Sequence, residues 1–207
     1  MSSQVVKATG RLLANHTALL VCDVQERFRD VIHSFPSVVH TCGTMIQGAK
    51  ALDVPVFVTE QYPKALGPTV EELQRLGLDT VMPKTQFSMA IPELDNQLEQ
   101  LRTVNKEINS VILCGIEAHV CVLQTAIDFI DNGYQVHVLV DGVSSRSPAD
   151  RSVALGRLQQ AGAFLSTSEM ALFQLMGDAK NAKFKEISKL VQAPRPAQVL
   201  GLGESLV

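Results

Sequence analysis

The 207-residue chain has the length of a single domain, and its composition, 46% hydrophobic and 19% charged, is typical of a globular protein. Its 18 basic and 21 acidic residues give a net charge of -3, and no Lys/Arg-rich run offers the basic surface that nucleic-acid binding requires. No window approaches the roughly 18 uninterrupted apolar residues of a membrane span. Nucleic-acid and membrane partners are therefore disfavoured.

We interpret residues 1–14 as an N-terminal arm, residues 15–192 as one domain and residues 193–207 as a C-terminal tail. The arm lacks acidic residues, a faint likeness to an organelle transit segment. We expect a cytoplasmic protein, with a mitochondrial location as the alternative. The tail contains apolar residues that could contact the domain or a second copy, namely Val199, Leu200, Leu202 and Leu206.

Short apolar runs, most of them rich in β-branched residues, recur along the chain and predict strands that are buried on both faces. They lie at residues 17–24, 54–60, 80–84, 110–116, 134–143 and 163–169. Amphipathic segments predict helices at residues 37–52, 69–76, 92–102, 119–131, 148–161, 169–176 and 180–192. Strands that alternate with helices indicate an α/β domain with a mainly parallel sheet covered on both faces, in a three-layer, Rossmann-like arrangement.

Two of these helices carry start signals. Thr69 with Glu72 has the spacing of a capping box, and Ser147 precedes Pro148 with Asp150 in the first turn, a pattern in which proline occupies the first helical position.

Ligands of open parallel sheets bind outside the carboxyl ends of the strands, and two opposite charges close predicted strands there. Asp23 directly follows the apolar residues LLVC of the first run, and Lys84 closes the run of residues 80–84. A buried carboxylate is costly without a partner. If both strand ends face one crevice, Lys84 and Asp23 compensate each other. The alternatives are an aspartate that caps the next turn and a lysine that is solvated in a loop.

Four cysteines differ in their predicted surroundings. Cys121 lies at the start of the predicted helix 119–131, where backbone N–H groups and the helix dipole stabilise a thiolate, and an adjacent lysine would add to this. Cys114 lies in the middle of a strand, where burial keeps a thiol neutral, and we expect Cys22 to be a core residue and Cys42 to pack on a helix. The alternative for Cys121 is also a buried core cysteine.

Histidine and metal chemistry are less consistent with the sequence. His137 is the only histidine after Cys121, and it lies inside a predicted strand, so Asp23 is a more plausible base for the thiol. The histidines and cysteines lack the spacings of metal ligands. The first strand is followed by no glycine-rich phosphate loop. We expect no metal and no other cofactor.

The motifs CDVQ, MPKTQFS and CGIEAHVCV together resemble those of the isochorismatase-like cysteine hydrolase family, and the resemblance spans residues 15–178. Within the family, TEQYPKALGPTV, SSRS and GAFLSTSE are most similar to eukaryotic isochorismatase domain-containing proteins. The metal motif of the family's nicotinamidases, Asp-x-His, is absent after Thr59, which argues against nicotinamide as the substrate. Isochorismatases that cleave a vinyl ether typically lack the nucleophilic cysteine, which is present here.

The resemblance implies a six-stranded parallel sheet, a catalytic triad of Asp23, Lys84 and Cys121, and a cis peptide bond between Ile116 and Glu117. It further implies an oxyanion hole formed by the backbone N–H groups of Glu117 and Cys121. The side chains that the resemblance places around the substrate pocket are Gln25, Phe28, Tyr62, Phe87 and His119.

From these residues we predict a cysteine-dependent hydrolase that cleaves a small amide or carbamoyl-type substrate through a covalent thioester. The first alternative is a catalytically silent binding or interaction module on the same fold. A nuclease ranks last, because the chain lacks a basic surface signature and a metal site. We expect a small-molecule substrate and a homo-oligomer.

Overall fold

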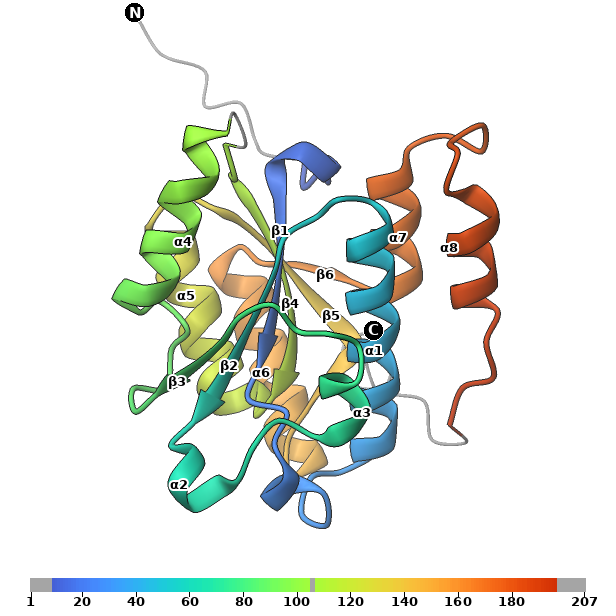
Figure 1. Cartoon of the computed structure of the whole chain (residues 1–207). Helices are drawn as coiled ribbons and strands as arrows, with labels where there is room; N and C mark the ends of the chain where they lie inside the picture. The colour runs from blue at the N-terminus through green and yellow to red at the C-terminus, as the bar shows by residue number, and fades with distance from the viewer. Residues whose placement is uncertain (1–8, 105–106, 197–207) are drawn as a thin grey trace, which may run out of the picture.

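The computed structural model describes residues 9–104 and 107–196, which fold as a three-layer α/β/α sandwich (Figure 1). Its six-stranded sheet has the order β3-β2-β1-β4-β5-β6, and all neighbouring strands are parallel. The strands are β1 (Thr17–Cys22), β2 (Val56–Gln61), β3 (Val81–Lys84), β4 (Ser110–Ile116), β5 (Gln135–Ser144) and β6 (Phe164–Ser166). The predicted fold class is confirmed.

Helices cover both faces of the sheet, and most of them begin and end close to the predicted positions. The α-helices are α1 (Phe35–Ala51), α2 (Pro63–Leu66), α3 (Glu71–Gln74), α4 (Pro92–Thr103), α5 (Leu123–Asp131), α6 (Pro148–Ala161), α7 (Ser168–Met176) and α8 (Phe184–Val191). Shorter turns are η1 (Ala14–His16), η2 (Glu26–Phe28) and the π-helical η3 (Ala118–Val122). Helix α2, η1 and η2 have no counterpart among the predicted elements.

The two core layers follow the alternation of side chains along each strand. In β1, Leu19 and Val21 pack in the layer that contains residues of α1, α7 and α8, whereas Leu20 and Cys22 pack in the layer with α4, α5 and α6. All six residues of β1 are buried. A strand covered on both faces explains why its sequence is continuously apolar.

One predicted helix start is confirmed and the other is wrong. The Ser147 hydroxyl accepts a hydrogen bond from the Asp150 N–H at 3.3 Å, with Pro148 in the first position of α6. Thr69 instead donates its N–H and hydroxyl to the Glu60 carboxylate, at 2.6 and 2.8 Å. Its side chain is therefore used to fix the loop after β2, and α3 begins two residues later without a side-chain cap.

The ends of the domain contact its body where the structure describes them. Leu12, inside the predicted arm, is buried in the core, whereas residues 1–8 lie outside the described residues. Arg195, inside the predicted tail, has its guanidinium 3.4 Å from the Glu169 carboxylate, whereas residues 197–207 lie outside the described residues. Among the residues described, no helix has the length and apolar character to cross a membrane.

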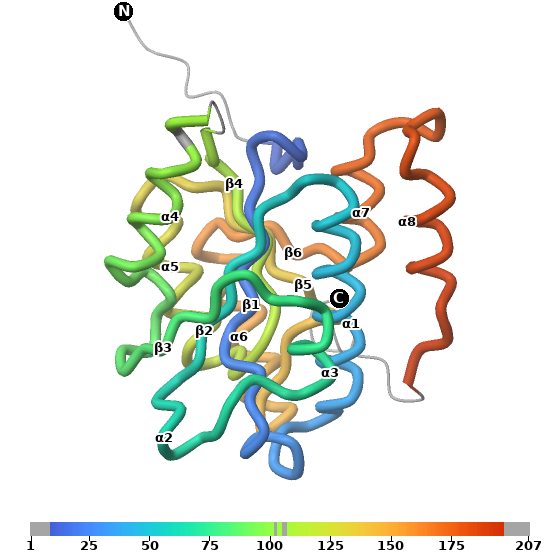
Figure 2. The backbone as a smooth tube through the Cα atoms, viewed as in Figure 1, coloured from blue at the N-terminus to red at the C-terminus, as the bar shows by residue number. Residues whose placement is uncertain are grey.

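The strand order puts the expected ligand crevice at the carboxyl ends of the two central strands. The chain runs outward from β1 through β2 to β3, then crosses to the other side of β1 as β4 and continues through β5 to β6 (Figure 2). Strands β1 and β4 pair from Thr17 with Ser110 to Cys22 with Gly115. A reversal of strand order of this kind is where open α/β sheets bind ligands.

Candidate active site

Asp23 follows the last residue of β1 and is held there by its neighbours from β2. Its backbone has a φ of 52°, in the left-handed region, which is costly for a residue with a side chain. Its N–H donates to the Thr59 carbonyl at 3.2 Å, and the Thr59 hydroxyl donates to its Oδ1 at 2.8 Å. These contacts leave Oδ2 to accept from the Lys84 ammonium and the Cys22 thiol.

Lys84 ends β3 and reaches Asp23 across β2. Its ammonium donates to Asp23 Oδ2 at 2.7 Å, and both side chains are only 1% exposed. The same nitrogen contacts Gln61 Oε1 at 2.8 Å and the carbonyl oxygens of Gln86 and Phe87 at 3.2 and 2.8 Å. A buried charge pair is tolerated when its remaining polar atoms are also satisfied, and Lys84 meets this condition.

Cys121 lies in the π-helical turn η3, directly before α5, and is 6% exposed. Its Sγ, the Cys22 Sγ and a carboxylate oxygen of Asp23 all lie within 4.8 Å of one another. The Thr125 hydroxyl donates to the Cys121 carbonyl at 2.6 Å and accepts from the Met89 N–H at 2.9 Å. Thr125 therefore ties the turn that carries the sulfur to the loop that follows Lys84.

The connection from β4 to Cys121 runs very close to β1. A Cβ atom on Gly115, which has a φ of 119°, would lie 2.1 Å from the Cys22 carbonyl oxygen, so only glycine fits there. The next peptide bond, between Ile116 and Glu117, is cis, at the position that the resemblance implied. The Glu117 carboxylate then accepts from the Arg146 N–H at 2.9 Å, which attaches this segment to the loop after β5.

The Cys22 thiol is a neighbour of the candidate nucleophile that the sequence did not reveal. We expected a core residue, and Cys22 is fully buried. Its Sγ, however, also contacts Asp23 Oδ2 at 3.5 Å. Burial, followed by the hydrogen bond with the Cys121 thiol, raises the pKa of the Cys22 thiol well above its usual range. Cys22 therefore stays protonated beside Asp23 and Cys121.

The donor atoms of Cys22, Asp23 and Cys121 are close enough together to be considered as metal ligands. Cysteine thiolates and carboxylates are each ligands that zinc accepts in proteins. Here, however, the Lys84 ammonium lies 2.7 Å from the same carboxylate, and a second cation beside it would be repelled. The group of residues is therefore better suited to proton transfer than to metal binding.

The predicted pocket residues fall into different environments. Gln25 is fully buried, and its side-chain amide bonds the backbone of Gln61 and the Gly67 carbonyl. Phe28 packs against the core layer of α1. His119 Nδ1 lies 2.9 Å from the Ser145 hydroxyl. These three side chains thus shape the segments around the crevice, each through a different partner.

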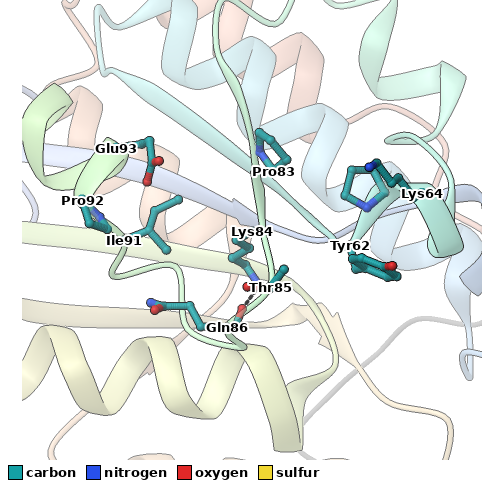
Figure 3. A pocket seen from close by; sticks show the side chains of 10 residues that line it. Tyr62, Lys64, Pro83, Lys84, Thr85, Gln86, Ile91, Pro92 and Glu93 are labelled. Atoms are coloured by element: carbon teal, nitrogen blue, oxygen red, sulfur yellow. Dashed lines mark hydrogen bonds between the residues drawn. The ribbon is translucent and has the colours of Figure 1, made fainter.

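Tyr62 and Phe87 are 51% and 49% exposed, and Tyr62 borders a cavity of about 480 Å³ beside β3 (Figure 3). Among the residues that line this cavity, Lys84 is the one that belongs to the predicted triad. Its ammonium donates to the carbonyl of Gln86, a second lining residue, in the hydrogen bond drawn in Figure 3. The cavity therefore adjoins the site through Lys84. Its other lining residues are Pro63, Lys64, Pro83, Thr85, Gln86, Ile91, Pro92 and Glu93.

The other two cysteines form a separate pair on the opposite face of the sheet. Cys42 on α1 and Cys114 on β4 are both fully buried in the layer of α1, as predicted. Their hydrogen bond, together with burial, raises the pKa of the Cys114 thiol well above its usual range. The inert character expected of Cys114 thus has a physical cause.

Sequence comparison agrees with this fold. The isochorismatase domain model matches residues 17–170, and the chain belongs to the isochorismatase family of hydrolases. Human isochorismatase domain-containing protein 2 is 50% identical over 194 residues, which cover 93% of this chain and 92% of the human protein. The secreted isochorismatase effector Isc1 of Phytophthora sojae is 47% identical over 194 residues, which cover 92% of this chain and 91% of the effector.

A solved structure is similar over nearly the whole chain. The Caenorhabditis elegans protein described as MAR1 ribonuclease superposes with a TM-score of 0.85 at 42% sequence identity, covering 95% of this chain and 98% of that one. The relatives thus carry two kinds of name, one from the family and one from an activity on RNA.

Proposed function

We propose that the protein is a cysteine hydrolase that cleaves a C–N bond of a small amide or carbamoyl-type substrate, with Cys121 as nucleophile. The observation that carries the proposal is the buried Asp23–Lys84 pair, 2.7 Å apart, with the Cys121 sulfur within 4.8 Å of the same carboxylate group. A general base beside a thiol and a fixed cation beside the base are what activation of a nucleophile needs.

In the proposed mechanism, Asp23 accepts the proton of the Cys121 thiol, and the sulfur attacks the substrate's carbonyl carbon. Lys84 balances the negative charge that is shared between carboxylate and sulfur. The C–N bond then breaks as Asp23 returns its proton to the departing amine. Water attacks the resulting thioester with Asp23 again as base, and the acid leaves with the free thiol restored.

The negative oxygen of each tetrahedral intermediate requires hydrogen-bond donors. We assign this role to the backbone N–H groups of Glu117 and Cys121, which lie on the segment between β4 and α5. A donor of this type contributes about 2.7–4 kcal/mol to transition-state stabilisation. The contacts that fix this segment, from Thr125 to Cys121 and from Arg146 to Glu117, therefore support catalysis through position.

The test is a screen of small amides and carbamoyl compounds in which rapid quenching is followed by intact-mass measurement. We expect an acyl adduct on the wild type that is absent from Cys121→Ala, and its added mass identifies the acyl half of the substrate. Cys42→Ala is the matched control, because it removes a buried thiol from the opposite face and should retain the adduct. Turnover by Cys121→Ala at the wild-type rate would contradict the covalent scheme.

The reactivity of the Cys121 thiol distinguishes the hydrolase from a catalytically silent binding module. A Cys121 that reacts with iodoacetamide at neutral pH faster than a free cysteine supports the hydrolase, because only the thiolate is nucleophilic. Reaction at the rate of a free cysteine, in protein shown to be folded, supports the binding module.

Ribonuclease activity is a second candidate because of the C. elegans structure, which bears that description at 42% identity. The net charge of -3 gives this chain no general attraction for phosphate backbones. Incubation of labelled RNA with the wild type, Cys121→Ala and Asp23→Asn decides the matter. RNA cleavage by the wild type that both substitutions abolish would assign it to this site, and cleavage that survives both would indicate a contaminant.

A further inference from the structure

The proposed hydrolysis uses one of the two thiols at this site and gives no task to the other. The sulfurs of Cys22 and Cys121 lie within 4.8 Å of each other, on segments that are 99 positions apart in the sequence. The pairing of Cys22 with Gly115 in neighbouring strands brings them together. Cys22 also contacts the Asp23 carboxylate at 3.5 Å, so a base is available to it.

We propose that Cys121 is a site of oxidation by hydroperoxides and that Cys22 converts the oxidised form into an internal disulfide, which reversibly blocks the nucleophile. The inference rests on the proposed function in one respect, since it requires that Cys121 be ionised. It adds a modification site and a role for Cys22 that hydrolysis does not need.

The first step consumes one hydroperoxide. The Cys121 thiolate attacks a peroxide oxygen, so that an S–O bond forms, the O–O bond breaks and the departing oxygen is protonated to water or an alcohol. The sulfur loses two electrons and becomes a sulfenic acid. Cys121 retains 6% exposure, whereas Cys22 has none. The peroxide therefore meets Cys121 first.

The second step needs no further oxidant. Cys22 gives its proton to Asp23 and attacks the Cys121 sulfur, an S–S bond forms, the S–O bond breaks, and the hydroxide leaves as water with that proton. The two thiols together have lost two electrons and two protons, which balance the reduction of the hydroperoxide to water and an alcohol or a second water. The raised pKa of the Cys22 thiol keeps it protonated until a sulfenic acid is present beside it.

The cysteine pair on the opposite face serves as an internal comparison. Cys42 and Cys114 are also in contact and fully buried. They lie in the core layer of α1, where the Asp141 carboxylate adds to the rise in the pKa of the Cys114 thiol, so the charge nearby disfavours a thiolate. If the distance between two sulfurs were the only requirement for a disulfide, peroxide would oxidise both pairs equally. Our proposal predicts that only the pair of Cys22 and Cys121 is oxidised.

The experiment treats the full-length protein with hydrogen peroxide in the presence of a metal chelator, blocks free thiols with N-ethylmaleimide and maps the unreduced peptides by mass spectrometry. Cleavage after Lys, Arg and Glu places the four cysteines on separate peptides. These are residues 12–26 with Cys22, 30–50 with Cys42, 108–117 with Cys114 and 118–146 with Cys121.

We expect peptide 12–26 to be linked to peptide 118–146, with a loss of two hydrogen atoms, and reductant to restore alkylation of Cys121. In Cys22→Ala, Cys121 should instead gain two oxygen atoms as a sulfinic acid, which reductant does not reverse. Cys22→Ser repeats the test with a side chain closer in size. Cys42→Ala should retain the cross-link of the wild type.

Other results would overturn the proposal in distinguishable ways. Sulfinic acid at Cys121 that accumulates equally in the wild type and in Cys22→Ala would remove the role of Cys22 and leave the hydrolase proposal intact. A cross-link through Cys42 or Cys114 would do the same. A Cys121 that neither oxidises nor cross-links would overturn this inference and the ionised nucleophile together.

Discussion

Lys84 and Asp23 form an ion pair of 2.7 Å in which each side chain is 1% exposed, and the two residues come from opposite sides of β2. Removing one partner of a buried pair leaves an uncompensated charge, which costs about 3–5 kcal/mol. We therefore expect Lys84→Met to lower the free energy of unfolding by that amount and to abolish turnover. Urea denaturation and an assay with the substrate found by screening provide the two measurements.

The double variant Asp23→Asn/Lys84→Met separates stability from catalysis. It removes both charges, so it should recover most of the lost stability while remaining inactive. A single Lys84→Met variant as stable as the wild type would show that the pair is not buried in solution as described.

Gly115 permits the close approach of β4 to β1, since a Cβ atom would lie 2.1 Å from the Cys22 carbonyl. We expect Gly115→Ala to lose about 3–5 kcal/mol, from an unfavourable φ and from overpacking, and to displace Cys121. Gly133→Ala is the matched control, because Gly133 also has a positive φ but nothing lies within 4 Å of its added methyl group. Gly133→Ala should lose only about 1–2 kcal/mol of stability, because the unfavourable φ is its single cost. Melting curves of both variants give the comparison, and equal losses would refute the steric argument.

Glu117 attaches the segment before Cys121 to the loop after β5 through the backbone N–H of Arg146. Glu117→Ala should cost about 0.5–1.5 kcal/mol, the net contribution of a typical hydrogen bond, because this one is exposed and water can replace the acceptor, and it should lower kcat by loosening the oxyanion segment. Arg146→Ala keeps the backbone N–H and removes a side chain that is 67% exposed, so its stability should change by less than about 0.5 kcal/mol. Kinetics and thermal unfolding measure both effects. A larger loss in Arg146→Ala than in Glu117→Ala would contradict the assignment.

His137 on β5 is 2% exposed, stacks on Phe164 and, within the described part of the chain, has no partner for its Nε2. Burial lowers the pKa of His137 to about 4. The unfolded chain, with a pKa near 6.5, therefore binds a proton at a higher pH than the folded protein does. Stability from this residue is complete above about pH 6.5 and is lost as the pH falls toward 4, by up to about 3 kcal/mol.

The test is to measure the urea midpoint of unfolding at pH values from about 7.5 down to about 4.5, which span this window. His137→Gln, which cannot take up a proton in this range, should show a shallower decline than the wild type. Parallel declines in the two proteins would assign the acid sensitivity to other groups.

The fold could be predicted because its strands and helices are specified by patterns among residues that are neighbours in the sequence. Continuous apolar runs identify strands buried on both faces, and the Ser147–Pro148 start of α6 is readable from neighbouring residues. Thr69 shows where this fails, because its hydroxyl could cap a helix or bond a distant carboxylate. It bonds Glu60, and sequence spacing contains no signal for that choice.

Some residues of the candidate site could likewise be predicted from the sequence, and others could not. Asp23 and Lys84 could be proposed as partners because both close strands, and topology brings strand ends together. Cys22 could not be assigned a place beside Cys121, because its position in an apolar strand is also that of an ordinary core residue. Thr125 and Ser145 were missed for a related reason, since their hydrogen bonds join segments whose distance depends on the packing of η3.

The central position of β1 also has a consequence for synthesis of the protein. This strand is made first but is flanked by β2 on one side and by β4, which ends at Ile116, on the other. A nascent chain can therefore pair only one edge of β1 until more than half of the polypeptide has left the ribosome, and long-range parallel pairing of this kind is slow. The sulfur of Cys121 consequently acquires its neighbours late, so a truncated translation product would expose an ordinary thiol and an unpaired hydrophobic strand to the cell's quality control.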